Sequence, residues 1–185
     1  MRWPPILAFI FASALTCVGD PPSHREWTSP DGKWFLACDC KGTWQPDSCS
    51  IALSHRSDHQ VFFTHHTSDR YIKAVWSSDS TRCVFLDAPD NANSYLWLFR
   101  VRGRDIATEK LDYEKISAAI EAAAPAARRY DPAGPGPRSG IDKLKWLSSS
   151  RLQLPIIYNN VPVTAALDIA KPQSPKIHVT PDKET

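Results

Sequence analysis

The chain has 185 residues, enough for one domain of ordinary size, and its hydrophobic fraction of 42% is sufficient for a real core. The formal net charge is only +2, with acidic and basic residues interspersed along the chain. This composition excludes wholesale disorder, and it gives no clustered basic surface for nucleic acid.

The first 19 residues have the pattern of a secretory signal peptide. Met1-Arg2 provides a short positive start, an apolar run extends from Ile6 to Val18, and Asp20-Pro21-Pro22 ends that run. The run is shorter than the roughly 20 residues that a transmembrane helix needs. We therefore expect an exported protein, either periplasmic or extracellular, in which residues 20–28 form a linker.

Two features of this leader stay open. We expect cleavage after Gly19, with Ala14 as the second choice, and an uncleaved anchor or a buried helix is the alternative. The stretch Ala14-Leu15-Thr16-Cys17 matches a bacterial lipoprotein signal only in part. Lipidation of Cys17 would make the protein a membrane-held adaptor, and this is the second interpretation of the leader.

Removal of the leader leaves four cysteines: Cys38, Cys40, Cys49 and Cys83. An even number of cysteines in an exported chain indicates disulfides, and four cysteines allow three pairings. The segment between Cys40 and Cys49 contains Gly42 and Pro46, which are typical of a turn that joins two strands. We therefore favour Cys40–Cys49 and Cys38–Cys83. A metal site is the weaker alternative because Cys-x-Cys lacks a second matching pair.

Residues 29–170 are predicted to form one mainly β domain. Ser29-Pro30-Asp31-Gly32 and Asn159-Asn160 are typical of tight turns, and they lie between segments with strand patterns. The predicted strands are residues 34–40, 50–54, 60–64, 72–76, 82–86, 95–101, 144–147, 152–158 and 161–169.

One helix is predicted over residues 112–124. Asp112 is a favourable N-cap and Pro125 ends the helix. Its apolar stripe is narrow and rich in alanine, so we expect this amphipathic helix to pack against a sheet. A Pro/Gly-rich loop follows at residues 131–140, and the polar, proline-rich residues 171–185 are predicted to be a disordered tail.

Parts of the chain repeat. The segment from Ser29 to Ala37 is echoed by the segment from Ser77 to Phe85, and more faintly by residues 148–154. Residues 74–101 contain Ala-Val-Trp-Ser-Ser-Asp-Ser, then Cys-Val-Phe-Leu, then Tyr-Leu-Trp-Leu-Phe. This order resembles one blade of the TolB-type, WD40-like β-propellers, in which a Trp-Ser-Pro-Asp-Gly turn joins two strands.

The resemblance covers one to two hairpin units and is best at residues 74–101. It implies hairpins of propeller type but not a ring, because a closed propeller has about 4–8 blades of four strands. In the second unit Ser78 and Ser80 stand where the family has Pro and Gly. The shared motif is structural, so no functional residue of the family is carried over to this chain.

Four histidines form the first candidate site: His55, His59, His65 and His66. Together they could bind zinc or another divalent ion. Solvated loop histidines are the alternative, because neighbouring strand residues such as His65 and His66 point to opposite faces. The loop 87–94 is rich in oxygen ligands but lacks the glycine and glutamate of a calcium-binding EF-hand loop.

Trp27 and Trp44 form the second candidate site, a binding patch for a protein or glycan. Capping of a sheet edge is the alternative for both. None of the common nucleophile, phosphate-binding or metalloprotease motifs occurs in the chain.

These observations predict an α+β, mainly β fold: an open antiparallel sheet of propeller-like hairpins with one amphipathic helix packed on it. The predicted function is an exported binding or structural module without a catalytic site or a cofactor. Its partner would be an unknown protein or glycan and not a nucleic acid, with membrane contact only if Cys17 is lipidated. The alternatives are a metal-binding protein or metal-dependent hydrolase that uses the histidines, and a lipid-anchored adaptor.

Overall fold

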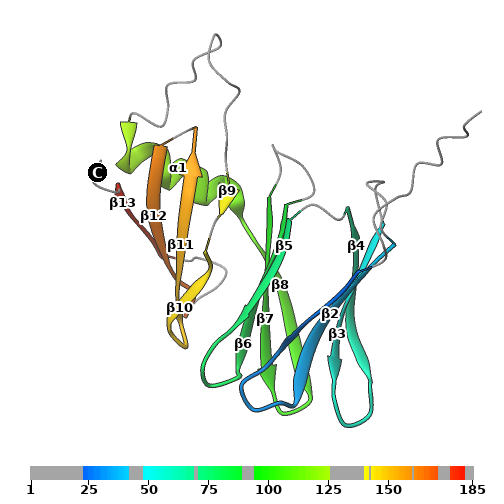
Figure 1. The fold of residues 1–185 in the computed structure, drawn as a ribbon. Helices are drawn as coiled ribbons and strands as arrows, with labels where there is room; N and C mark the ends of the chain where they lie inside the picture. The colour runs from blue at the N-terminus through cyan, green and yellow to red at the C-terminus, as the bar shows by residue number, and fades with distance from the viewer. Residues whose placement is uncertain are drawn as a thin grey trace, which may run out of the picture.

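The structure is a computed structural model that describes residues 23–41, 48–68, 71–88, 94–125, 140–141, 143–159, 161–170 and 176–181. These residues form three antiparallel sheets and one helix (Figure 1). The prediction of a mainly β, α+β fold is therefore confirmed.

The first two sheets are four-stranded meanders in which each strand pairs with the next along the chain. Sheet A consists of β1 (Ser23–Thr28), β2 (Trp34–Cys40), β3 (Cys49–His55) and β4 (Val61–Thr67). Sheet B consists of β5 (Tyr71–Trp76), β6 (Arg82–Ala88), β7 (Tyr95–Arg102) and β8 (Asp105–Leu111).

The third sheet is joined to the second through the helix α1 (Tyr113–Ala123). Sheet C consists of β10 (Lys145–Ser148), β11 (Arg151–Tyr158), β12 (Val161–Asp168) and β13 (Lys176–Pro181), and the short β9 (Gly140–Ile141) pairs with β11. Neighbouring strands are antiparallel here as well.

Sheet B lies between sheets A and C (Figure 1). Its central strand β6 is buried along both faces: Cys83 and Phe85 belong to the core shared with sheet A, whereas Val84 and Leu86 belong to the core shared with sheet C. A strand that is covered on both sides needs a continuous apolar run, and Cys83-Val84-Phe85-Leu86 is such a run. Sheet B therefore holds the stack together.

The helix follows the sequence prediction closely. Its N-cap is Asp112, whose carboxylate accepts a hydrogen bond from the backbone N of Lys115 at 3.2 Å. Ile116 and Ile120 are buried in the core between sheets B and C, and the helix packs against β12 and β13. Within the described residues, no helix is both long and apolar enough to cross a membrane.

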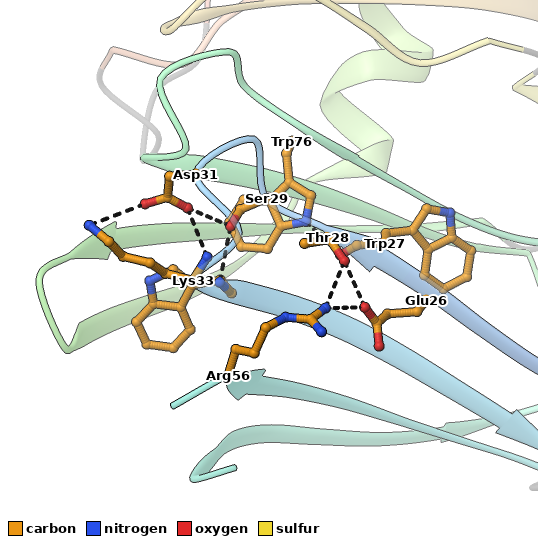
Figure 2. Close-up of polar contacts among 9 residues, drawn as sticks. Glu26, Trp27, Thr28, Ser29, Asp31, Lys33, Arg56 and Trp76 are labelled. Carbon is orange, nitrogen blue, oxygen red and sulfur yellow. Dashed lines mark hydrogen bonds and ion pairs between the residues drawn. The ribbon is translucent and has the colours of Figure 1, made fainter. Parts of the chain in front are cut away.

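The repeat in the sequence corresponds to two equivalent turns. In sheet A, Ser29 Oγ donates to Asp31 Oδ1 (2.7 Å) and accepts from the backbone N of Trp34 (3.0 Å), as Figure 2 shows around Ser29 and Asp31. In sheet B, Ser77 Oγ donates to Asp79 Oδ1 (2.6 Å) and accepts from the backbone N of Arg82 (3.0 Å). The sheets therefore share one turn geometry.

The second turn has a serine, Ser80, at the position where the first turn has a glycine. Ser80 has φ 60° and stands where the first turn has Gly32, at φ 71°. A non-glycine residue in this left-handed region is strained. Its hydroxyl, however, accepts a hydrogen bond from the backbone N of Asp31 at 2.9 Å. The serine therefore connects the turn of sheet B to the turn of sheet A.

Two tryptophans connect consecutive sheets in the same way. Trp76 Nε1 of sheet B donates to the backbone oxygen of Trp27 in sheet A (2.8 Å; Figure 2). Trp146 Nε1 of sheet C donates to the backbone oxygen of Val75 in sheet B (2.9 Å). In each case the acceptor is two residues before the turn serine, Ser29 or Ser77. The three sheets are thus joined by a repeated contact.

Four strands in the described part of the chain were not predicted from the sequence: β1, β8, β9 and β13. The predicted linker contains β1, and the predicted disordered tail contains β13. Both strands have few large apolar residues, and each is stabilised by pairing with a neighbour that lies elsewhere in the sequence, β2 or β12. The predicted leader, residues 1–19, and most of the predicted loop 131–140 lie outside the described residues.

We predict that the backbone strain at Ser80 lowers the stability of the protein and that the hydrogen bond from Asp31 to its hydroxyl raises it. Ser80→Ala keeps the strained backbone and removes the hydroxyl acceptor, so the free energy of unfolding should fall by about 1 kcal/mol. Ser80→Gly removes the same acceptor but also the strain, so it should be about 1 kcal/mol more stable than the alanine variant. Urea unfolding curves measure both changes. Equal stability of the two variants would contradict the assigned strain.

Candidate functional site

The inner face of sheet A, which faces sheet B, contains two adjacent rows of residues with reactive or polar side chains. Pairing between strands sets these rows. One row consists of Ser23, Cys40, Cys49 and Thr67, and the next consists of Arg25, Cys38, Ile51 and His65. Both rows lie toward the ends of β2 and β4 and the start of β3, away from the turn at Ser29.

The sulfur cluster is formed by three cysteines in these rows. Cys40 and Cys49 face each other across β2 and β3 and form a disulfide, with a Cα–Cα distance of 4.1 Å. Cys38 Sγ lies 3.5 Å from Cys40 Sγ. The guanidinium of Arg25 lies against both sulfurs, with Nη2 at 3.5 Å from Cys40 Sγ and 3.9 Å from Cys38 Sγ. The Cys40–Cys49 pairing expected from the sequence is therefore present.

The expected Cys38–Cys83 pairing is not present, since both residues are buried thiols. The positions of the two turns explain this result. Trp34 and Arg82 are equivalent, because each accepts the backbone N–H of its turn serine. Cys83 is one residue beyond Arg82, whereas Cys38 is four residues beyond Trp34. The two cysteines are therefore offset by three residues, or about 10 Å, along the strands. A disulfide requires Cα atoms within about 7 Å of each other.

Cys83 is chemically isolated from the cluster. It is fully buried between Trp76 and Phe99, its neighbours in the pairing of sheet B. Burial raises the pKa of the Cys83 thiol well above its ordinary value. Its thiolate is therefore disfavoured at neutral pH, and the residue packs as a small apolar side chain.

A second feature, the polar clasp, joins sheets A and B. It consists of His65, Thr67 and Asp87. His65 Nε2 lies 2.8 Å from Asp87 Oδ2, and Thr67 Oγ1 donates to Asp87 Oδ1 at 2.7 Å. The Asp87 side chain is only 1% exposed, and that of His65 is 25% exposed. Because Asp87 belongs to β6 and the other two residues to β4, these contacts cross the interface.

Aromatic rings enclose the histidine of the polar clasp. The His65 ring stacks on Phe63 at a centroid distance of 6.2 Å and lies 5.6 Å from Trp97. Phe85 of β6 meets the same ring edge-on at 6.1 Å. These rings limit the access of water to the His65–Asp87 contact, which strengthens its electrostatic component.

The four histidines expected to bind a metal are not brought together. His55 and His59 lie at the turn between β3 and β4, whereas His65 points inward to Asp87 near the opposite end of β4. His66 is exposed on the outer face, as strand alternation requires. Among the described residues, the only cluster of potential metal ligands consists of the three sulfurs of the sulfur cluster.

The turn that contains His55 and His59 is held by ordinary contacts. His55 Nδ1 lies 2.8 Å from Ser57 Oγ and 3.6 Å from Asp58 Oδ1. The backbone N of Gln60 donates to Asp58 Oδ1 at 3.2 Å, and this bond is the main reason that the pKa of Asp58 lies below its usual value. These contacts are typical of a stabilised loop.

Of the tryptophans expected to form a binding patch, Trp27 lies in β1 and packs against the core between sheets A and B. Its backbone oxygen accepts the indole N–H of Trp76. Trp27 is therefore partly engaged within the protein. Trp44 lies outside the described residues.

The sequence alone does not identify Arg25, Thr67 or Asp87 as site residues. Arg25 lies in the predicted linker, and Asp87 begins the predicted loop 87–94. The alternation of β4 gives a usable signal, since it separates the inward Phe63, His65 and Thr67 from the outward His66. Their partner Asp87, by contrast, is 22 residues from His65 in another sheet, and the sequence does not specify that contact.

We predict that the polar clasp contributes measurably to stability. Asp87→Asn removes a buried charge acceptor and leaves His65 and Thr67 poorly matched. The free energy of unfolding should therefore fall by about 1–3 kcal/mol, measured by chemical denaturation.

The matched control is Asp39→Asn. His24 Nδ1 and Asp39 Oδ1 lie 2.6 Å apart, but both side chains are more than half exposed. Solvent screens such a pair, so the change should be within about 0.5 kcal/mol. Similar losses in both variants would contradict a special role for the buried clasp.

No family model matches the chain, and no curated protein matches it. The sulfur cluster and the polar clasp, together with the arrangement of the three sheets, are thus the observations on which a functional proposal can be built.

Proposed function

We propose that the protein is an exported binding or structural module that does not act as a catalyst. The observation that supports this proposal most strongly is the buried Cys40–Cys49 disulfide. Disulfides persist in oxidising compartments outside the cytoplasm, so the bond is compatible with the signal-peptide pattern of residues 1–19.

A binding or structural role is supported by how the reactive groups are used. The carboxylate of Asp87 binds two side chains of the neighbouring sheet, and the thiol of Cys83 is fully buried. The strongest polar contacts at the interface thus connect elements of the protein to one another. These contacts favour a rigid stack, as expected for a module that presents a fixed surface.

We further infer that sheets A and B are blade-like units of the TolB and WD40 type. Support comes from their four-stranded meanders and from the equivalent turns at Ser29 and Ser77. The outer face of sheet A presents Asp39, Ser50 and His66 to solvent. A polar outer face is what limits the stacking of further repeats in repeat proteins.

The partner is an extracytoplasmic protein or glycan in this proposal. Large apolar side chains are exposed on four strands: Val61 on β4, Tyr71 on β5, Leu147 on β10 and Ile157 on β11. These residues are the first positions at which contact with a partner should be sought. A lipid anchor at Cys17 would restrict that contact to the membrane surface.

The export proposal is tested by counting thiols in the protein isolated from its native compartment. Denatured protein should react with N-ethylmaleimide at two cysteines of the mature chain, Cys38 and Cys83, before reduction, and at four after reduction. A chain produced without residues 2–19 should stay in the reducing cytoplasm and react at four from the start. Four reactive thiols before reduction, in the protein isolated from its native compartment, would refute the proposal.

The binding proposal is tested with a photoreactive amino acid placed singly at Val61, Tyr71, Leu147 or Ile157. In cells that export the protein natively, at least one position should give a discrete cross-linked product. The control position is Ser50, which is exposed on the polar face of sheet A. No product at any of the four positions, or the same products at Ser50, would contradict binding through these residues.

A further inference from the structure

The sulfur cluster contains more sulfur than one disulfide needs. We propose that, in the reduced protein, Cys38, Cys40 and Cys49 form a three-coordinate thiolate site for copper(I). The disulfide form and the metal form would be two alternative states of the same three sulfurs. This proposal concerns a ligand, and it goes beyond the binding or structural role described above.

The positions of the sulfurs fit a single ion. The three Sγ atoms all lie within 4.8 Å of one another. A metal ion bonded to sulfur at about 2.3 Å, at the centre of a triangle, separates its ligands by about 4 Å. Rotation about the Cα–Cβ bonds of Cys40 and Cys49, once their disulfide is reduced, supplies the remaining adjustment. No rearrangement of β2 or β3 is needed.

The composition of the cluster selects the metal. Thiolate ligands favour soft ions, copper(I) and zinc among them. Structural zinc almost always has four ligands, whereas among the described residues no histidine or carboxylate joins the three sulfurs. All three cysteines are at most 3% exposed. A buried, all-sulfur, three-ligand site suits a monovalent ion that tolerates low coordination and is protected from oxidation by exclusion of solvent.

Arg25 supplies a charge that such a site requires. Three thiolates and one copper(I) ion have a net charge of −2, which is costly at a buried position. The Arg25 guanidinium lies 3.5 Å from Cys40 Sγ and 3.9 Å from Cys38 Sγ, and it would offset one of these charges. The guanidinium therefore places a positive charge beside two of the three sulfurs.

Conversion of the disulfide form to the metal form requires a dithiol as reductant. A dithiol gives two electrons and two protons to the Cys40–Cys49 bond, so the dithiol becomes a disulfide and the protein gains two thiols. Copper(I) then forms three copper–sulfur bonds and displaces the thiol protons to solvent. The oxidation state of copper does not change in that step.

The test is an anaerobic titration of the full mature chain with copper(I) after reduction, in competition with a chromophoric copper(I) chelator. The reduced protein should bind one equivalent, and X-ray absorption should show three sulfur ligands. The oxidised protein should bind at least a hundredfold more weakly, because two of the ligands are then joined. Near-ultraviolet circular dichroism reports whether the reduced chain keeps its packed tryptophans.

Two cysteine variants separate the proposed site from other thiols. Cys38→Ser keeps the disulfide pair but removes the third ligand, so the reduced variant should bind copper(I) at least tenfold more weakly and show two sulfur ligands. Cys83→Ser is the matched control, a buried thiol in the same core but outside the cluster, and it should bind like the wild type. Equal affinity of Cys38→Ser and the wild type would overturn the proposal.

Arg25→Gln tests whether the folded cluster is responsible, since it leaves every sulfur in place. Loss of the guanidinium should weaken copper(I) binding about tenfold, whereas an unfolded chain would show no such dependence. Unchanged affinity in Arg25→Gln, or fourfold coordination with tighter binding of zinc than of copper(I), would overturn the assignment. None of these results bears on the thiol count that tests export, so the two proposals can fail separately.

Discussion

The burial of sheet B on both faces is the constraint on which the rest of the structure depends. The strand β6 contributes side chains to a hydrophobic core on each of its two faces, and this requires that every residue from Cys83 to Leu86 be apolar. Sheet A then has to cover one face of sheet B, and sheet C with α1 has to cover the other. Ser80, Trp76 and Trp146 fix how sheets A and C are placed against sheet B, because each of them makes a hydrogen bond to a neighbouring sheet.

The polar clasp and the sulfur cluster both occupy one end of the interface between sheets A and B. Near the turns at Ser29 and Ser77 this interface is filled by large apolar side chains, Trp34 and Phe99 among them. At the other end, His65 and Thr67 of sheet A contact Asp87 of sheet B, and the sulfurs of Cys38 and Cys40 lie against each other within sheet A. One end thus provides most of the hydrophobic stabilisation, while the other provides specific contacts that fix the pairing of the two sheets.

This division bears on function. The disulfide within sheet A restrains β2 and β3, so the adjoining β4 presents His65 and Thr67 to Asp87 from a rigid support. The sulfur cluster thus lies directly beside the strand that holds the polar clasp. Thr67, one of the residues of the polar clasp, is paired directly with Cys49 of the disulfide.

Much of the fold could be predicted from local patterns. Apolar runs and turn residues predicted β2, β3 and β4 of sheet A, β5, β6 and β7 of sheet B, and β10, β11 and β12 of sheet C, and Asp112 and Pro125 bounded the helix. The strands β1, β8 and β13 were missed because alternation with few large apolar residues is weak evidence until the partner strand is known. The Cys38–Cys83 pairing was wrong because it depends on the offset between two sheets, which spacing along the chain does not reveal.

The site was less predictable than the fold for the same reason. Cys40 and Cys49 have a sequence separation of only 9, so their pairing is local information. Asp87 meets His65 only because β4 and β6 face each other, and Arg25 reaches the sulfurs only because β1 pairs with β2. The first contact follows from the stacking of two sheets and the second from the pairing of two strands, and spacing along the chain specifies neither of them.

Hydrogen exchange of the native backbone tests the stacking account most directly. If sheet B is covered on both sides, the amides of β6 and β7 should exchange slowest, only through global unfolding. The amides of the edge strands β1 and β13 should exchange faster by local opening. Exchange in β6 as fast as in β1 would show that sheet B is open on at least one face and would contradict the central claim.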